Sequence, residues 1–105
     1  MKIQGIFKEY EVKAIATNYC NNGNFAVQLL DYDSVYDCWE PYASLTVNFH
    51  KKLPENMAYV DTNNVPNAEK FIKKYKLGEH QGKFMFSGFC CYPLYKFYPE
   101  KLEKR

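Results

Sequence analysis

Alternation of apolar and polar side chains between Tyr42 and Phe49 restricts the fold more than any other feature of the chain. One side of an extended strand would carry Ala43, Leu45, Val47 and Phe49, and the other side Tyr42, Ser44, Thr46 and Asn48. A strand with one apolar and one wetter face is typical of an antiparallel sheet that packs on a core. The ten Tyr and eight Phe of the sequence support this interpretation, because aromatic residues favour strands.

Further strands are predicted on both sides of this segment. They are a strand or hairpin over 4–19 and strands over 25–30, 57–60, 83–86 and 92–98. The run Asn21–Asn24 contains Gly23 and is a strong turn signal, because Asn and Gly accept positive φ cheaply. Residues 31–41 are expected to form an acidic connection.

One helix is predicted over 65–77. Its apolar face has the helical spacing i, i+3, i+4, i+7 and consists of Ala68, Phe71, Ile72 and Tyr75. Asn63 or Asn64 can cap its start, and Pro66 is tolerated in a first turn. Gly78 stands where a left-handed C-terminal cap belongs.

These elements predict an α+β fold in which about five antiparallel strands form a sheet and the helix packs on it. The 105 residues fit a single domain, 1–105, and an apolar content of 47% suffices for a core. The charged tail after Pro99 is expected to be a short helix or a frayed end.

The cellular location of the protein and the redox state of its cysteines are inferred from features that the sequence lacks. No stretch reaches the roughly 18 apolar residues of a membrane span, and Met1–Tyr10 has no signal-peptide core. We therefore expect a cytoplasmic protein. Its four cysteines include no Cys-x-x-Cys pair, which favours free structural thiols over a metal or redox site.

No pattern of catalytic residues emerges, so we expect a non-catalytic protein without cofactor or metal. Nothing in the sequence places His50 or His80 beside a cysteine, and Ser87 lacks the Gly-x-Ser-x-Gly elbow. The run 31–33 resembles the start of a calcium loop, but the required Gly and terminal Glu are missing.

A protein-binding surface is predicted in the acidic connection, because exposed Tyr and Trp are favoured at interfaces. The candidate residues are Tyr32, Asp33, Tyr36, Asp37 and Trp39. Their combination of rings and carboxylates suits a basic partner surface. The alternative is that the rings only cover the sheet.

A nucleic-acid surface is the second interpretation, because residues 62–105 carry a net charge of +5 against −3 for residues 1–61. The candidate lysines are Lys70, Lys73, Lys74, Lys83 and Lys96. Lysines near stacking aromatics are what a single-strand binder needs. Against this, the sole arginine is Arg105, and arginine makes most bidentate contacts to bases and phosphates.

The second half of the chain also resembles a known family. The motif residues are the run Tyr59-Val60-Asp61-Thr62-Asn63-Asn64, then Pro66, Ala68-Glu69, Phe71-Ile72, Leu77-Gly78-Glu79 and Gly82, and finally Ser87-Gly88-Phe89-Cys90, Tyr92-Pro93-Leu94-Tyr95 and Phe97. They are similar to those of a small family of unknown function from low-GC Gram-positive bacteria, their phages and integrative elements. The resemblance covers roughly 24–103.

This resemblance assigns no catalytic residues, but it implies a mobile-element setting in a bacterial host. Small proteins of such elements often inhibit host defence enzymes, which makes an anti-CRISPR or other anti-defence inhibitor the sharpest hypothesis. The partner would then be a host protein such as a CRISPR nuclease. Because the chain is not a strongly acidic DNA mimic, it would have to block a specific protein surface or a guide complex. A nucleic-acid-binding accessory protein of a mobile element is the alternative.

Overall fold

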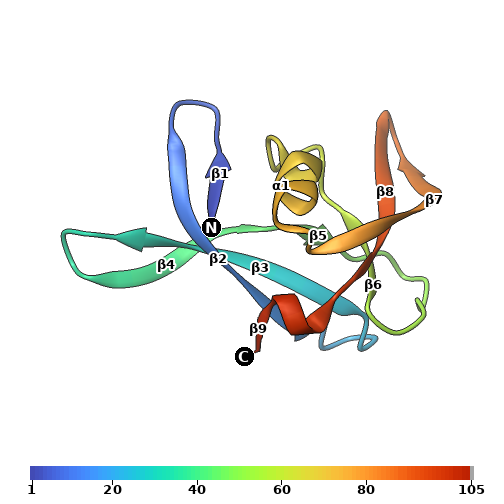
Figure 1. Ribbon diagram of the computed structural model, residues 1–105. Coiled ribbons are helices and arrows are strands. Elements are labelled where there is room, and N and C mark those ends of the chain that lie inside the picture. Colours follow the sequence, from blue (N-terminus) through green and yellow to red (C-terminus); the bar gives the residue numbers. More distant parts are fainter. Residues whose placement is uncertain (105) are drawn as a thin grey trace.

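The computed structural model describes residues 1–104 and places a short helix against two sheets (Figure 1). The first sheet has the order β1-β2-β3-β4, from Lys2–Gln4, Glu9–Asn18, Phe25–Asp33 and Cys38–Ser44, and β9 (Glu103–Lys104) pairs in parallel with β2. The second has the order β5-β6-β8-β7, from Thr46–Val47, Met57–Val60, Cys90–Phe97 and Gly78–Ser87. The other pairings are antiparallel. The α+β prediction is confirmed, but the expected sheet of about five strands is in fact two sheets.

The chain passes from one sheet to the other at Leu45, inside the segment 42–49 that was predicted as one strand. Strand β4 ends one residue before Leu45 and β5 begins one residue after it. The Leu45 N–H donates to the Val27 carbonyl of the first sheet (2.9 Å), and the Leu45 carbonyl accepts the Asp61 N–H that follows β6 (2.9 Å). Thr46, expected on the wetter face, is buried because its hydroxyl oxygen accepts the Val27 N–H (3.2 Å).

The crossing divides the apolar side chains of this segment between two clusters. Leu45 is fully buried in the main core between the sheets and the helix. Val47 and Phe49 instead pack around Tyr59 and Tyr92, in a smaller cluster on the other face of the second sheet. The apolar residues of this one alternating segment therefore pack in two different cores.

Helix α1 spans Ala68–Tyr75 and is shorter than the predicted range 65–77. The Asp61 carboxylate accepts both the backbone N–H (3.1 Å) and the side-chain amide (3.0 Å) of Asn64, which holds the preceding residues in turns. The position before the helix is therefore occupied by Asn67, in the left-handed region and without a side-chain cap bond.

The helix ends earlier than predicted as well. Lys76, with φ 54°, provides the left-handed C-cap that was assigned to Gly78. Gly78 already belongs to β7, and a Cβ there would lie 2.8 Å from the Lys96 carbonyl oxygen of β8. Glycine is therefore needed for close strand approach rather than for helix termination.

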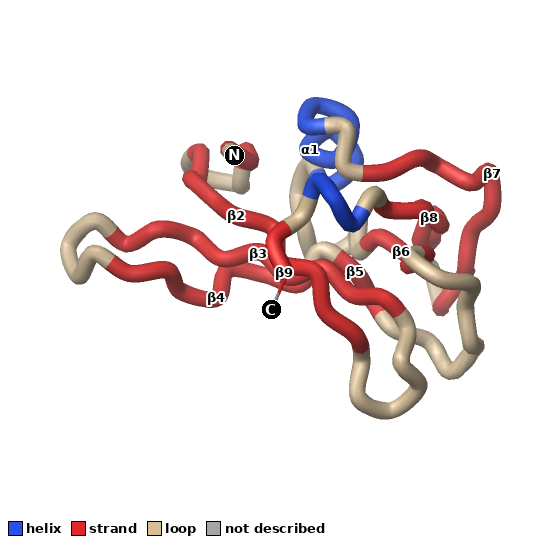
Figure 2. Tube along the Cα trace, turned by 60° about the horizontal axis from the view of Figure 1, so that its bottom comes forward, coloured by secondary structure: helices blue, strands red, loops and turns tan. Residues whose placement is uncertain are grey.

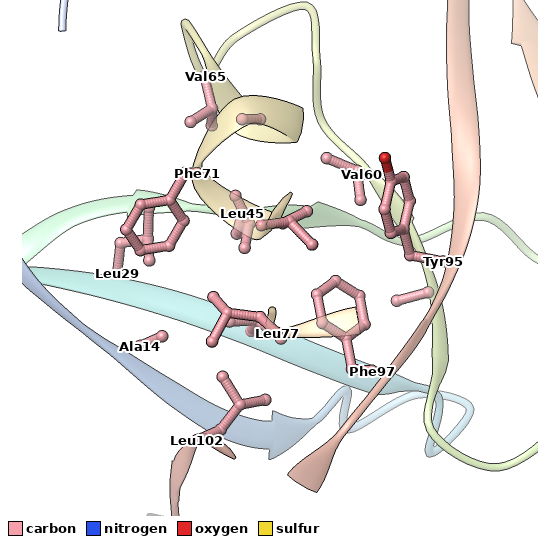
Figure 3. Close-up of a cluster of buried hydrophobic side chains, with 14 of the residues drawn as sticks. Ala14, Leu29, Leu45, Val60, Val65, Phe71, Leu77, Tyr95, Phe97 and Leu102 are labelled. Carbon is pink, nitrogen blue, oxygen red and sulfur yellow. The ribbon is translucent and has the colours of Figure 1, made fainter. Parts of the chain in front are cut away.

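The main core lies where α1 faces both sheets, as Figure 3 shows. Phe71 and Ile72 point into it from the helix and are 3% and 0% exposed, whereas Tyr75 is only half-buried. The buried Tyr95 of β8 fixes the helix to the second sheet, because its hydroxyl donates to the Glu69 carboxylate (2.5 Å). Burial and this hydrogen bond raise the pKa of Tyr95, so its phenol stays neutral.

Four predicted segments need further correction. Residues 31–41 are no connection, because β3 continues to Asp33 and β4 begins at Cys38, with a turn between them. The predicted strands 83–86 and 92–98 are the longer β7 and β8. The tail forms a 3₁₀ turn over Pro99–Lys101 and then β9, while Arg105 lies outside the described residues.

An asparagine network ties the β2–β3 turn to the loop before β6. The side chain of Asn24, which is 3% exposed, donates to the Lys51 carbonyl (2.9 Å) and to Asn48 Oδ1 (3.3 Å). Its own Oδ1 accepts the Leu53 N–H (3.0 Å). One amide therefore satisfies three polar groups of a loop that has no regular structure.

We expect Phe71→Asp to unfold the protein, because it would bury an unpaired carboxylate between α1 and the sheets. The expected loss in the free energy of unfolding is at least about 3–5 kcal/mol. Urea titration followed by circular dichroism measures it. Lys73→Asp, on the exposed face of the same helix, is the matched control; equal stability of both variants would contradict the packing of α1.

We expect Asn24→Ala to lower the free energy of unfolding by about 2 kcal/mol, because it removes three hydrogen bonds and leaves a loop N–H without its partner. Asn63→Ala, at an exposed position, should change it by less than about 0.5 kcal/mol. Thermal or urea unfolding of both variants tests this, and similar values for the two would show that the network does not hold the loop.

Candidate protein-binding surface

The free end of the β3–β4 hairpin, residues 31–40, is the candidate surface and is called the arm below. Strand β2 pairs with β3 only as far as Asp31, so the rest of the arm projects beyond the sheet (left in Figure 1). The structure brings all five predicted protein-binding residues together on the arm: Tyr32, Asp33, Tyr36, Asp37 and Trp39.

Two of the predicted contact residues shape the turn at the end of the arm. Asp33 Oδ1 accepts the backbone N–H groups of Val35 (2.9 Å) and Tyr36 (3.3 Å), as Asp does in many turns. Asp37 adopts the left-handed region with φ 52°, which Asp tolerates better than most residues. These carboxylates therefore hold the turn in one conformation, in addition to any contact they make outside the chain.

Tyr32 and Trp39 face each other across the arm. They are paired in register, and their ring centroids lie 5.4 Å apart in an edge-on arrangement. The Tyr32 hydroxyl donates a short hydrogen bond to the Asp37 carboxylate, and this bond is the main reason why the pKa of Tyr32 is raised. Lys13 Nζ lies 4.7 Å above the Trp39 ring, so the base of the arm is fixed by a cation–π contact.

The tip of the arm is apolar and exposed. Tyr36 is 76% exposed, and Val35, which was not among the predicted residues, is 82% exposed. The sequence did contain a signal for Val35, because it is a β-branched apolar residue between Ser34 and Tyr36 in a segment that was expected to be a polar connection. Tyr32 and Trp39 are also partly exposed, so four apolar or aromatic side chains of the arm are accessible to a partner.

Like charges are paired across the arm. Asp31 lies directly opposite Glu40 in the β3–β4 register. The arm contains four carboxylates and no Lys or Arg, and none of the four forms an ion pair within residues 1–104. Opposed carboxylates on neighbouring strands destabilise a hairpin, so this placement weakens the arm rather than stabilising it.

The candidate nucleic-acid-binding lysines do not form one surface. Lys70 and Lys74 line a small hollow between α1 and β1, while Lys73 lies elsewhere on the helix. Lys83 lies at the irregularity in β7. Strand alternation places Lys96 with Leu94 on the face of the second sheet turned away from α1.

Residues 1–104 contain no assembled group of metal-ligating side chains. No cluster of three or more His, Cys, Asp or Glu side chains is placed to hold a metal there, and the four cysteines are free. His80 packs between the rings of Phe84 and Tyr95, and its Nδ1 accepts the Gly82 N–H (2.8 Å). The helices of this part of the chain are too short or too polar to span a bilayer.

An open groove of about 670 Å³ lies beside the asparagine network. It runs between the β2–β3 turn, the loop around Leu53–Asn56 and the chain near Pro99. Its charged lining, Lys52, Glu55 and Lys104, is of mixed sign. The groove contains no grouping of residues that favours a particular ligand.

Comparison with known proteins identifies a family but no activity. A family model described as "Domain of unknown function (DUF4313)" matches residues 14–105. No curated protein and no solved structure matches the chain. The resemblance to a family of unknown function is thereby confirmed in its general form, over a longer range than the motif residues span.

We expect Asp37→Asn to lower the pKa of Tyr32 toward the ordinary value of about 10. The variant removes the charged acceptor that favours the neutral phenol, while Asn keeps the left-handed backbone of position 37. NMR titration of the tyrosine rings over the alkaline range measures the change, with Tyr32→Phe assigning the signal. An unchanged pKa would show that the Tyr32–Asp37 hydrogen bond does not form in solution.

Proposed function

The chain belongs to the DUF4313 family, and we propose that it is a non-catalytic protein-binding module whose arm docks on a basic surface of its partner. The observation that carries the proposal is the pairing of Asp31 with Glu40 on a projecting hairpin that has no basic residue of its own. Features that weaken a local structure without internal compensation concentrate at functional sites.

Electrostatic complementarity explains the unbalanced charge. The repulsion between Asp31 and Glu40 persists in the free protein, because no cation within residues 1–104 pairs with either carboxylate. A lysine- or arginine-rich partner surface would supply the missing charge and relieve the repulsion. It would also steer the encounter between the two proteins.

The arm also has the anchors and the rigidity that binding requires. Val35 and Tyr36 expose apolar area at the tip, and Tyr is among the residues that carry most binding energy at interfaces. The Asp33 and Asp37 hydrogen bonds fix the turn before binding, so less conformational entropy is lost when the partner docks.

The class of partner is proposed from the motif resemblance of the second half of the chain. A setting on a phage or other mobile element favours a host defence enzyme as the partner, including a CRISPR nuclease. Nucleases present basic surfaces to their nucleic acids, and an acidic arm with aromatic anchors is suited to occupy such a surface. In this proposal the protein is an anti-CRISPR or other anti-defence inhibitor that acts in the bacterial cytoplasm.

A nucleic-acid-binding accessory protein remains the alternative function. One observation favours it: Lys2, Lys70 and Lys74 line the same hollow between β1 and α1. Glu9 shares that lining and forms an ion pair with Lys2 (3.9 Å), which reduces the local positive charge. Binding through phosphates would weaken steeply with salt and would be lost on nuclease treatment.

We expect Glu40→Lys to make the protein more stable and the complex weaker. The substitution replaces opposed like charges by an opposed ion pair with Asp31, which should raise the free energy of unfolding by about 0.5 kcal/mol. The same change places a cation against the basic partner and should reduce its capture at least about tenfold. Tagged proteins are compared for retention of a stoichiometric partner from nuclease-treated host lysate, with identification by mass spectrometry.

Glu55→Lys is the matched control, since it makes the same charge change at an exposed site outside the arm. The proposal holds if one partner is retained by the wild type and by the Glu55 variant but lost with Glu40→Lys. Equal retention by all three proteins would exclude the arm as the binding surface. Loss of all bound material on nuclease treatment would instead favour the nucleic-acid alternative.

A further inference from the structure

A second exposed apolar surface lies on the β7–β8 hairpin, far from the arm (Figure 1). Phe84 and Phe86 of β7 are 48% and 73% exposed, and Phe89 in the connecting turn is fully exposed. The sequence from Phe84 to Tyr95 contains no charged residue. Three exposed phenylalanines on one uncharged hairpin form the kind of patch that marks an interaction site.

Strand β7 is the outermost strand of its sheet, as the order β5-β6-β8-β7 and Figure 2 show. Only two residues join Ser87 to Cys90, and in such a hairpin the flanking pair exchanges both backbone hydrogen bonds. Alternation then directs the backbone groups of Met85 toward β8 and those of Phe84 and Phe86 toward the free edge. Pro93 agrees with this, because it lies opposite Phe84, where no N–H is needed.

The two halves of β7 differ in how their edge is protected. The first half carries Glu79 and Lys83, and the pairing with β8 is interrupted between His80 and Phe84, where Gly82 has φ 73°. Charges and irregularities of this kind prevent edge-to-edge association. The second half, from Phe84 to Ser87, is regular, uncharged and uncovered.

We propose that this second half of β7 pairs with the same segment of a second copy of the chain, in an antiparallel, two-fold register centred on Met85. In this register Phe84 of each copy lies opposite Phe86 of the other, and Met85 lies opposite Met85. The outward backbone groups of Phe84 and Phe86 meet their counterparts, which gives four intermolecular hydrogen bonds. The two four-stranded sheets become one continuous sheet.

Side-chain chemistry is consistent with this register. The two Phe84–Phe86 pairs are aromatic cross-strand pairs on one face, a favourable class of contact in antiparallel sheets. Lys83 would lie opposite Ser87, so no like charges oppose each other. A register shifted by one residue would put Phe84 opposite Met85 and would turn the phenylalanines of the two copies to opposite faces.

The exposed area is sufficient for a weak dimer. The exposed fractions of Phe84, Phe86 and Phe89 together equal about 2.3 whole side chains, which is about 350–580 Å² per copy at 150–250 Å² for each ring. Two copies therefore contribute up to about 700–1,150 Å², near the lower limit of about 1,000 Å² for a specific interface. We expect dissociation in the micromolar range or above.

The absence of charge favours a second copy over a charged partner. Between Phe84 and Tyr95 the hairpin offers nothing that a charged partner surface could pair with, whereas its own segment matches it in apolar character, backbone direction and length. A two-fold contact of this kind is closed, so it ends at two copies.

Sedimentation equilibrium over a wide range of concentration tests the proposal on the 105-residue chain. We expect a reversible monomer–dimer equilibrium for the wild type. Phe84→Glu and Phe86→Lys should each shift dissociation to at least tenfold higher concentration, because each places a charge against a phenylalanine of the other copy. Phe7→Lys, at a 93% exposed aromatic residue outside β7, is the control and should leave the equilibrium unchanged.

The double variant Phe84→Glu/Phe86→Lys tests the register itself. In the proposed pairing each introduced carboxylate lies opposite an introduced ammonium group of the other copy, so dimerisation should return at low salt and weaken as salt is added. Circular dichroism of each variant verifies that the fold is retained. A wild type that stays monomeric, single variants that dimerise normally, or a double variant that stays monomeric like the single ones would each overturn the proposal.

Discussion

The two hydrogen bonds of the Leu45 backbone are the constraint on which the rest of the fold depends. The N–H is bound to Val27 in the first sheet, and the carbonyl is bound to Asp61 at the end of β6 in the second. Because Leu45 is also fully buried, the change of sheet occurs inside the core. The two sheets are thereby joined at this residue, and α1 packs on the core between them (Figure 1, Figure 3).

This arrangement explains why the functional candidates lie at hairpin ends. The core is concentrated where both sheets and the helix meet, so strands longer than that region extend past it. The β3–β4 arm carries Val35 and Tyr36 beyond the sheet, and the β7–β8 hairpin carries Phe86 and Phe89. At these ends there is no core to bury the apolar side chains, so they stay exposed, and in our two proposals a partner would cover them.

The local elements could be predicted from the sequence, but the two-sheet arrangement could not. Periodicity located the helix face with Phe71 and Ile72 and the strand around Leu45, because side-chain direction follows directly from the backbone repeat. The same periodicity does not show where a chain changes sheets, since Leu45 and Val47 have the same parity but pack in different clusters. The start of the helix was misplaced because Asp61 accepts hydrogen bonds from Asn64, three residues along the chain, and holds this segment in a local turn. Its end was misplaced because Lys76 rather than Gly78 adopts the left-handed cap.

The arm, which we propose as the binding surface, could be located in the sequence in part, and for a physical reason. Aromatic and acidic residues together indicated the arm, although it was expected to be a connection rather than a hairpin. What the sequence could not show is the strand register, which places Asp31 opposite Glu40 and assigns Asp33 and Asp37 to the turn.

The two proposals concern separate surfaces of the molecule and are compatible with each other. The arm and the β7–β8 hairpin lie at opposite ends of the molecule in Figure 1, so pairing through β7 would leave the arm free. A two-fold dimer would then present two acidic arms, and a partner with two suitable basic surfaces would bind them in one complex. The second contact would form at the high effective concentration set by the first. Because a dimer near the lower size limit dissociates in the micromolar range or above, this gain would depend on the concentration of the chain, and strong binding would arise only when the protein is abundant.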